Sequence, residues 1–293
     1  MKILHLDSGR EMRGGQWQAL RLHRGLLERG HQSLLLARGE SPLLTAAQKA
    51  RLPCDVLYPL HLGAQSRGVD VVHAHDARSH SLGALMARAP LVVSRRVGFP
   101  VRDSAASRWK YGRARLFLAV SRHVAGQLTA AGVEAGRIAV VYDGVRVPRE
   151  PAAGSAILAP YTDDPRKRMV LAKEAARIAG VTMKTSENLD ADLPGAHALV
   201  YLTQSEGLGS GILLGMAHAV TVIASRVGGI PELIEDGVNG ILVENDAAAV
   251  AAAFERIDPR LGLAARATVI AQFTEERMIE STIEAYERML ADA

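Results

Sequence analysis

Residues 205–243 read SEGLGSGILLGMAHAVTVIASRVGGIPELIEDGVNGILV, and no other stretch of the chain is as informative. A carboxylate, Glu206, is followed at once by a glycine-rich turn and then by an apolar run that is typical of a buried helix. Glycines let the backbone approach a ligand closely, and a helix N-terminus offers unpaired N–H groups and a positive dipole end. The stretch therefore predicts a phosphate site beside a carboxylate that accepts hydrogen bonds from hydroxyls, and a nucleotide sugar carries both kinds of group.

Length and composition indicate an ordinary globular protein. The chain has 293 residues, 48% hydrophobic and 23% charged, enough for one large core or two modest ones. Its single cysteine, Cys54, excludes an internal disulfide framework and fits a reducing compartment. No apolar run approaches the roughly 20 residues of a membrane span, and the first residues lack the pattern of a signal peptide. We therefore expect a cytoplasmic protein.

The charge is divided unevenly along the chain. Residues 1–150 contain 23 Lys and Arg against 11 Asp and Glu, a net charge of +12. The remainder contains 12 against 20, a net charge of −8, and the two halves sum to the overall +4. A basic half joined to an acidic half indicates two domains with different partners. The basic half either faces an anionic acceptor or membrane surface, or simply attracts the acidic half.

Apolar runs alternate with amphipathic stretches throughout, which predicts parallel sheets covered by helices on both faces. Prolines and small residues cluster at 147–155, the expected linker. The predicted strands are 2–6, 33–37, 71–74, 91–94, 116–120, 138–141, 156–159, 181–184, 198–202, 221–224 and 240–243. The predicted helices are 16–29, 82–88, 123–131, 165–179 and 274–290.

The opening stretch also resembles a known family. S-E-G-x-G, an apolar helix with Met-Ala, a strand ending in Ala-Ser, V-G-G-I-P-E and D-G-x-N-G resemble the donor-site region of family-4 retaining glycosyltransferases. The resemblance implies the GT-B fold, in which two Rossmann-like domains with parallel sheets face each other across a cleft. It implies an acceptor-side domain at 1–147, a nucleotide-sugar donor domain at 148–272, and a helix at 273–293 that packs back on the first domain.

Three features of the first half are candidate site residues. The pair Gly14-Gly15 lies between the first strand and the first helix, where it could cradle a phosphate, and resembles a G-G loop of the family. Alternation places His73 and His75 on one side of a strand, with His75 as the functional candidate and His73 as a packing residue. A metal site would need further ligands, and the sequence reveals none, so no metal is expected. Arg96 stands where many family members have a histidine and could neutralise a departing diphosphate.

The second half supplies the remaining candidates. By resemblance, Glu206 holds hydroxyls of the transferred sugar, and a basic residue near the helix predicted at 165–179 holds the diphosphate. Arg166 and Lys167 are the candidates for that basic residue. The glycine-rich turn and the start of its helix complete the donor site. These residues are Gly207, Leu208, Gly209, Ser210 and Gly211.

The chain departs from the family pattern at three places. Pro160-Tyr161 stands where a G-R pair is usual, so that arginine is missing. Leu214 stands where a second glutamate usually holds the ribose of the nucleotide. Only about fifty residues separate the strand at 156–159 from Glu206, room for roughly two strand–helix units where the family has one more. All three departures concern the donor, and two of them its nucleoside.

The sequence thus predicts a short, metal-independent, retaining hexosyltransferase. Its substrates would be a nucleotide-sugar donor and a glycan or lipid-linked acceptor of cell-surface polysaccharide synthesis. No nucleic acid partner and no cofactor are expected, whereas peripheral contact of the basic half with an anionic membrane is. Two alternatives stay open: a non-catalytic GT-B partner that binds a glycan or scaffolds another enzyme, and a nucleotide-sugar epimerase. The epimerase would need acid and base groups around the sugar, and the sequence offers no convincing set.

Overall fold

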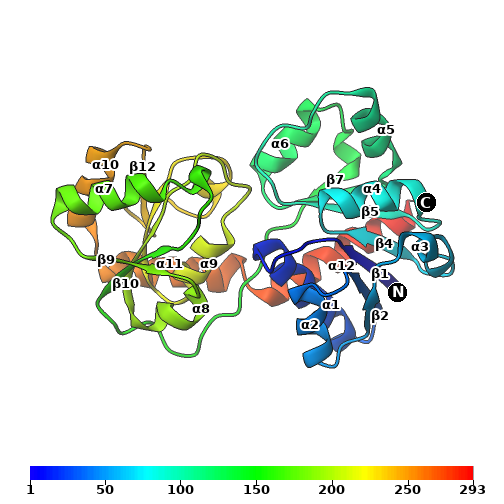
Figure 1. Ribbon diagram of the computed structural model, residues 1–293, viewed down its shortest axis with the longest axis horizontal. Helices are drawn as coiled ribbons and strands as arrows, with labels where there is room; N and C mark the ends of the chain where they lie inside the picture. The colour runs from blue at the N-terminus through cyan, green and yellow to red at the C-terminus, as the bar shows by residue number, and fades with distance from the viewer. Residues whose placement is uncertain (293) are drawn as a thin grey trace. The chain divides into compact units, whose positions relative to one another are not determined.

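The chain forms two compact units, each built on one parallel β-sheet, in a computed structural model that describes residues 1–292 (Figure 1). Unit 1 comprises Met1–Arg96, Pro100–Tyr142 and the described residues from Glu275 onward. Unit 2 comprises Asp143–Thr274 together with the short segment Val97–Phe99. The fold class predicted from the sequence, two α/β domains with parallel sheets, is confirmed.

Unit 1 contains a seven-stranded sheet in the order β3-β2-β1-β4-β5-β6-β7. Its strands are β1 (Lys2–Asp7), β2 (Gln32–Ala37), β3 (Cys54–Val56), β4 (Val71–Ala74), β5 (Leu91–Arg95), β6 (Leu116–Ala119) and β7 (Ile138–Val140). From β1 the chain builds outward to one side as far as β3 and then crosses to β4 on the other side of β1. The carboxyl ends of β1 and β4 therefore form a topological switch point, where parallel α/β sheets bind their ligands.

The described residues of unit 1 form seven α-helices and one 3₁₀-helix. They are α1 (Gly14–Glu28), α2 (Pro42–Lys49), α3 (Pro59–Gln65), α4 (Ala77–Met86), α5 (Ala105–Arg113), α6 (Arg122–Ala130), η1 (Ala135–Arg137) and α12 (Glu275–Ala291). Although α12 is encoded last, it packs on α1 and supplies Met278 and Tyr286 to the core of unit 1. Gly25 permits this close approach, since a Cβ there would lie 2.1 Å from the Ile279 side chain.

Unit 2 contains a five-stranded sheet in the order β12-β11-β10-β8-β9, so its switch point lies between β8 and β10. The strands are β8 (Ala156–Pro160), β9 (Met183–Ser186), β10 (Ala196–Tyr201), β11 (Thr221–Ser225) and β12 (Ile241–Val243). The helices are α7 (Met169–Ala179), α8 (Leu189–Asp192), α9 (Ser210–Ala217), α10 (Ala247–Ala253) and α11 (Pro259–Gln272). Short 3₁₀ turns are η2 (Pro165–Lys167), η3 (Leu193–Gly195), η4 (Ile230–Glu232) and η5 (Phe254–Arg256).

The predicted strands are all present to within two residues at their ends, but several elements were not predicted. The short strand β3 and the helices α2, α3, α5, α8, α10 and α11 are additions. The single helix predicted at 165–179 is wrong in its first turn. Arg168 adopts a left-handed conformation with φ 51°, which separates the 3₁₀ turn η2 from α7. Within residues 1–292, no helix combines the length and apolar character needed to span a membrane.

Candidate functional site

The candidate donor site of unit 2 lies at the switch point of its sheet. Lys167 follows β8 at the end of η2, and Glu206 follows β10 in the loop that leads to α9. The structure brings the two side chains together, with Lys167 Nζ 2.6 Å from Glu206 Oε2. A third residue, Tyr201, joins them: its hydroxyl donates to the same Glu206 oxygen at 2.9 Å and accepts from Lys167 at 3.0 Å.

This cluster keeps its charges because each group has a partner. The Lys167 and Glu206 side chains are 31% and 16% exposed, so water screens the pair only in part. Burial alone would lower the pKa of Lys167, but the charge and hydrogen bonds of Tyr201 and Glu206 outweigh it and raise that pKa above its ordinary value. Burial and the neighbouring Glu206 carboxylate raise the pKa of Tyr201, so its hydroxyl stays a donor. The site therefore presents a cation and an anion at one point.

A buried hydrogen-bond network holds the loop that carries Glu206. The Ser225 hydroxyl at the end of β11 accepts from the Thr203 amide at 2.9 Å and donates to the Asn245 side chain at 2.7 Å. The Asn245 amide in turn donates to the Thr203 carbonyl at 2.9 Å. Gly228 packs closely against the same loop. Its backbone is left-handed, and a Cβ there would lie 2.0 Å from the Glu206 carbonyl oxygen.

The glycine-rich turn after Glu206 leads directly into α9. The Gly207 amide donates to Glu206 Oε1 at 3.1 Å, and the Leu208 side chain is buried. Gly209 adopts φ 112°, a conformation that disfavours side chains, and forms the N-cap without any side-chain cap. The amides of Ser210 and Gly211 thus open the helix as the sequence predicts, in the position that suits a phosphate.

The other donor-side candidates lie apart from this cluster. Arg166 is exposed and pairs with Asp164, which also caps η2, at 2.6 Å. Of the two basic candidates, the structure therefore brings only Lys167 to Glu206. Leu214 is half-buried in α9.

In unit 1, the residues predicted at the candidate site also gather at the switch point. Gly14 and Gly15 are the first two residues of α1, which residues 8–13 separate from β1, so the pair lies in the helix and not in a loop before it. A Cβ at Gly15 would lie 3.7 Å from the Arg96 side chain. Arg96 follows β5, and its Nη1 lies 3.4 Å from Nδ1 of His75, at the end of β4. Gly15, His75 and Arg96 thus form one group.

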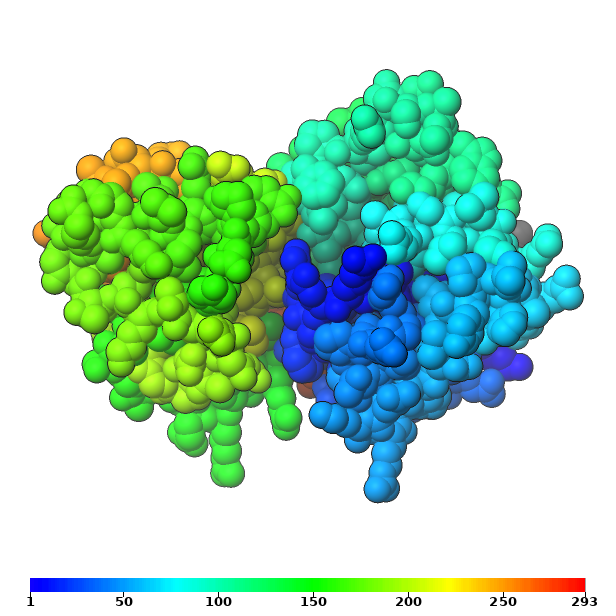
Figure 2. All heavy atoms as spheres, viewed as in Figure 1, coloured from blue at the N-terminus to red at the C-terminus, as the bar shows by residue number. Residues whose placement is uncertain are grey.

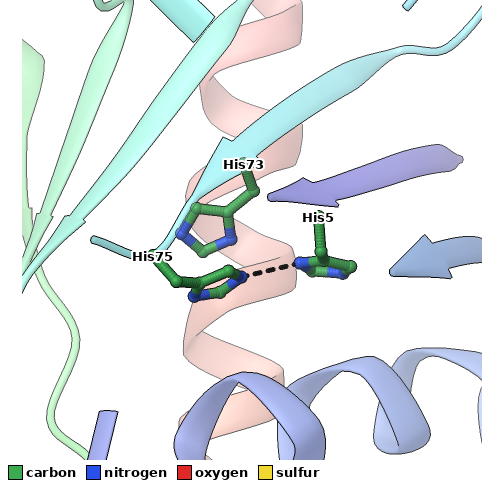
Figure 3. A group of neighbouring side chains, drawn as sticks. All are labelled: His5, His73 and His75. Atoms are coloured by element: carbon green, nitrogen blue, oxygen red, sulfur yellow. Dashed lines mark hydrogen bonds between the residues drawn. The ribbon is translucent and has the colours of Figure 1, made fainter. Parts of the chain in front are cut away.

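The structure corrects one expectation here, because a third histidine does accompany His73 and His75. His5 of β1 stands opposite His73 of β4 in the parallel register, and its Nδ1 lies 2.9 Å from His75 Nε2 (Figure 3). One nitrogen from each of the three rings falls within 4.8 Å of the others, so the group could in principle hold a metal ion. His73 also packs as expected, between Ser94 at 2.8 Å and Tyr286 of α12 at 2.6 Å.

Burial keeps these histidines neutral. The three histidines are at most 5% exposed, and desolvation by burial together with the positive charge of Arg96 lowers the pKa of each well below its usual range. The adjacent Asp7 responds in the opposite direction, since burial raises the pKa of its carboxyl to about 6. Asp7 accepts from the Gly9 amide at 2.8 Å and from Gln16 at 3.1 Å, which ties β1 to the start of α1.

The sequence interpretation missed three residues of these groups, and each left a signal. Tyr201 is the single polar side chain in the otherwise apolar run ALVYL, which precedes the Glu206 loop. His5 and Asp7 interrupt the first strand two residues apart, on the side that alternation assigns to one face. Placing them beside His75 and Arg96 required the strand order, since β1 and β4 are far apart in the sequence.

Two parallel-sheet units with polar groups at both switch points define a GT-B type of glycosyltransferase architecture. Residues 12–149 match the family described as Glycosyltransferase Family 4, and residues 152–257 match the one described as Glycosyl transferases group 1. The chain belongs to the family-4 glycosyltransferases with the GT-B fold.

Relatives of known sequence match only part of the chain. An alpha-maltose-1-phosphate synthase from Mycolicibacterium smegmatis is 37% identical over 112 residues, which cover 34% of this chain and 29% of the synthase. An uncharacterized glycosyltransferase from Methanocaldococcus jannaschii is 48% identical over 48 residues, covering 16% of this chain and 14% of that protein. The matches therefore span less than a third of either relative.

Solved structures match the whole fold at low identity. HepE from Anabaena, in complex with UDP and glucose, aligns with a TM-score of 0.85 at 16% identity over 98% of this chain and 99% of that one. Sucrose-phosphate synthase from Thermosynechococcus elongatus aligns with a TM-score of 0.76 at 18% identity over the full length of both chains. At such identities the likeness establishes the fold alone.

Proposed function

We propose that this protein transfers a hexose from a nucleotide-sugar donor to an acceptor hydroxyl, with retention of configuration and without a metal ion. The observation that carries the proposal is the Lys167–Tyr201–Glu206 cluster beside the uncapped start of α9. A carboxylate that can hold sugar hydroxyls, next to a cation and free helix amides that can hold phosphate, suits a sugar linked to a diphosphate. The UDP and glucose bound by the similarly folded HepE support this choice of ligand class.

The proposed reaction requires positioning and charge stabilisation. The bond between the sugar's anomeric carbon and the diphosphate oxygen breaks, and a bond from that carbon to the acceptor oxygen forms on the same face. The acceptor's proton passes to the departing phosphate oxygen, so no strong protein base is needed. Glu206 would orient the sugar, while Lys167 and the amides of Gly209–Gly211 would stabilise the departing diphosphate.

In the free protein Lys167 is paired with Glu206, and this pairing has a consequence for binding. The donor must offer both groups new partners: phosphate oxygens for the ammonium and hydroxyls for the carboxylate. A ligand with only one of these groups would leave the other member of the pair partly buried without its partner, which is costly. The site should therefore discriminate against inorganic phosphate and free sugars.

A panel of UDP-, GDP-, ADP- and TDP-linked sugars tests the proposal by measuring transfer and donor hydrolysis. We expect activity with at least one donor and a loss of about a hundredfold or more in Glu206→Ala. Glu174→Ala is the matched control, because Glu174 forms an ion pair on the exposed face of α7 in the same unit. Absence of both transfer and hydrolysis, with unchanged nucleotide binding in Glu206→Ala, would refute the enzymatic function and favour the non-catalytic GT-B partner, for which Leu214 argues.

For the acceptor, we propose a glycan or lipid-linked glycan of the cell surface, handled at an anionic membrane in the cytoplasm. Support comes from α5, which buries none of its residues and lies at the surface of unit 1 (Figure 2). Trp109 in this helix is 50% exposed, and the segment 102–115 also contains the cations Arg102, Arg108, Lys110, Arg113 and Arg115. Basic side chains with an exposed tryptophan suit an anionic lipid surface. Flotation with anionic liposomes tests this, and binding that ignores salt or persists in Trp109→Ala with Arg108→Ala would contradict it.

A further inference from the structure

Three side chains of unit 1 form a buried hydrogen-bonded chain that leads from Arg96 into the sheet. Arg96 Nη1 lies 3.4 Å from His75 Nδ1. Figure 3 shows the next contact, in which His75 Nε2 lies 2.9 Å from His5 Nδ1. The contact to Arg96 is long, whereas the one between the rings has ordinary hydrogen-bond length. The two rings are stacked, with centroids 5.1 Å apart.

The direction of this chain follows from which atoms can carry a proton. A guanidinium only donates, so Nδ1 of His75 must accept and the ring's proton must be on Nε2. That Nε2–H then donates to Nδ1 of His5, which places the His5 proton on its own Nε2. Burial favours neutral rings at both positions, as the lowered pKa of each indicates. The chain is therefore Arg96 to His75 to His5.

A metal ion among the three histidines would need the same nitrogens. The His73 nitrogens face Tyr286 and Ser94, and Nε2 of His75 and Nδ1 of His5 face each other. Among residues 1–292, Nε2 of His5 has no hydrogen-bond partner, but this is not the His5 nitrogen that faces His75. The positive charge of Arg96 also opposes a cation nearby. The hydrogen-bonded chain thus accounts for the cluster better than a metal site does.

We propose that His5 is a positioning residue that fixes the tautomer of His75, so that a neutral imidazole lone pair faces the Arg96 guanidinium. A carboxylate in that place would orient the arginine but cancel its charge. A neutral acceptor orients the guanidinium without cancelling its positive charge, which can attract an anionic group of a substrate. This inference rests on the proposed function for the identity of the anion, a phosphate, but not for the geometry of the chain.

Histidine nitrogen chemical shifts of the free protein test the chain directly. The expected result is a proton on Nε2 of both His75 and His5 in the wild type, and a mixed tautomer of His75 in His5→Phe, which keeps a ring but removes the acceptor. His5→Asn places an amide oxygen near the position of Nδ1 and should restore the wild-type tautomer of His75. A wild-type His75 protonated on Nδ1 overturns the proposal without any variant.

Binding of UDP and of inorganic pyrophosphate, measured by calorimetry, tests the consequence. We expect His5→Phe to weaken binding about tenfold and His5→Asn to stay within about twofold. In an Arg96→Ala background, His5→Phe should have no further effect, because His5 acts through Arg96. An equal loss in both backgrounds indicates a merely structural role and overturns the proposal.

Two further results separate this inference from the proposed function. If the purified protein carries stoichiometric zinc that is lost in His5→Asn, the cluster is a metal site and the hydrogen-bonded chain is refuted. If wild-type protein neither binds UDP nor transfers any sugar, the proposed function fails, while the nitrogen shifts of the free protein still decide whether His5 fixes His75.

Discussion

The two switch points of this molecule carry polar clusters built in opposite ways. At the carboxyl ends of β1 and β4, neutral histidine rings are stacked in the interior, at most 5% exposed. At the ends of β8 and β10, a half-buried ion pair between Lys167 and Glu206 is completed by Tyr201. Both sheets offer the same kind of edge, but the cluster in the first is made of neutral rings and the cluster in the second contains a direct ion pair.

Burial explains the difference. In unit 1, desolvation makes a charged ring costly, so the histidines stay neutral and affect a ligand only through neighbours such as Arg96. In unit 2, Lys167 and Glu206 are partly exposed, so the desolvation cost of keeping both charged is smaller. A ligand can therefore replace either residue as the partner of the other. We therefore expect the first cluster to serve geometry and the second to serve binding, and we expect variants that affect one to leave the other unchanged.

The largest effect is expected from removing the cation of unit 2. Lys167→Met should lower transfer about a hundredfold or more, because the diphosphate and Glu206 then lack their counter-charge. Steady-state kinetics with the best donor provide the measurement. Arg177→Met is the control, since Arg177 forms an exposed pair with Glu174 on α7 and should stay within about twofold. Similar losses in both variants would mean that the cluster has no special role.

The next effect concerns the turn that presents Glu206. Gly228→Ala combines a left-handed backbone with a Cβ only 2.0 Å from the Glu206 carbonyl oxygen, so we expect a loss of about 3 kcal/mol in unfolding free energy. Gly237→Ala has the same left-handed strain, at φ 76°, but its nearest neighbouring atom lies at 3.9 Å, so about 1 kcal/mol is expected. Urea unfolding measures both. Equal losses would show that the clash with Glu206 is relieved elsewhere.

Acid should destabilise unit 1 before unit 2. Burial lowers the pKa of His23 and His80 to about 4, so between pH 6.5 and 4 the unfolded state binds protons that the folded state excludes. The contribution of these histidines to the free energy of unfolding is therefore fully present above pH 6.5 and is lost as the pH falls from 6.5 to 4. For His23 this loss is roughly 3 kcal/mol at most. Asp7, with its pKa raised to about 6, opposes this trend below pH 6.

Tryptophan fluorescence follows this transition in unit 1 selectively, because both tryptophans of the chain, Trp17 and Trp109, belong to that unit. His23→Asn removes the titrating ring, so the number of protons taken up on unfolding in this pH window should fall by up to one. The amide keeps a polar atom near Ser33. His61→Gln, on the exposed surface, is the control and should leave the slope unchanged. A slope that His23→Asn does not alter would contradict the assignment of His23 as an acid-sensitive group.

The smallest effect is expected at Tyr201. Tyr201→Phe removes the hydroxyl that links Lys167 and Glu206 but keeps their direct contact, so kcat/KM should fall about fivefold, or about 1 kcal/mol. Tyr161→Phe, whose exposed hydroxyl contacts only Asp163 among the hydrogen bonds at this turn, should be indistinguishable from wild type. A loss as large as that of Lys167→Met would assign the hydroxyl a direct role in the reaction.

Much of this architecture could be predicted from the sequence, because alternating apolar runs locate strands wherever the sheet is buried. The predicted strands therefore agree with the structure, and local chemistry is enough to predict Glu206 with its glycine turn as a candidate site. Among the helices that were not predicted, α5 has a clear reason: it buries none of its residues and has no apolar period to detect. The left-handed conformation of Arg168, which separates η2 from α7, could not be predicted from the sequence either, since arginine rarely adopts it.

Long-range pairings were the other limit. Nothing local joins Lys167 to Glu206, 39 residues later, or His5 to His75, 70 residues later. Both contacts follow from strand order, which places β8 beside β10 and β1 beside β4. The sequence therefore predicted Lys167, Glu206 and His75 as separate candidates, and only the topology shows which partners they have.

The helix α12 has a consequence for biosynthesis. Its Tyr286 is fully buried and bonded to His73, and Met278, Ile279 and Met289 belong to the same core. A ribosome must therefore synthesise the chain beyond Tyr286 before unit 1 can complete its core, although most of that unit emerges first. Nearly all of unit 2 lies in the continuous segment Asp143–Thr274, which emerges earlier than α12. During translation, the unit encoded second is thus the first able to finish folding.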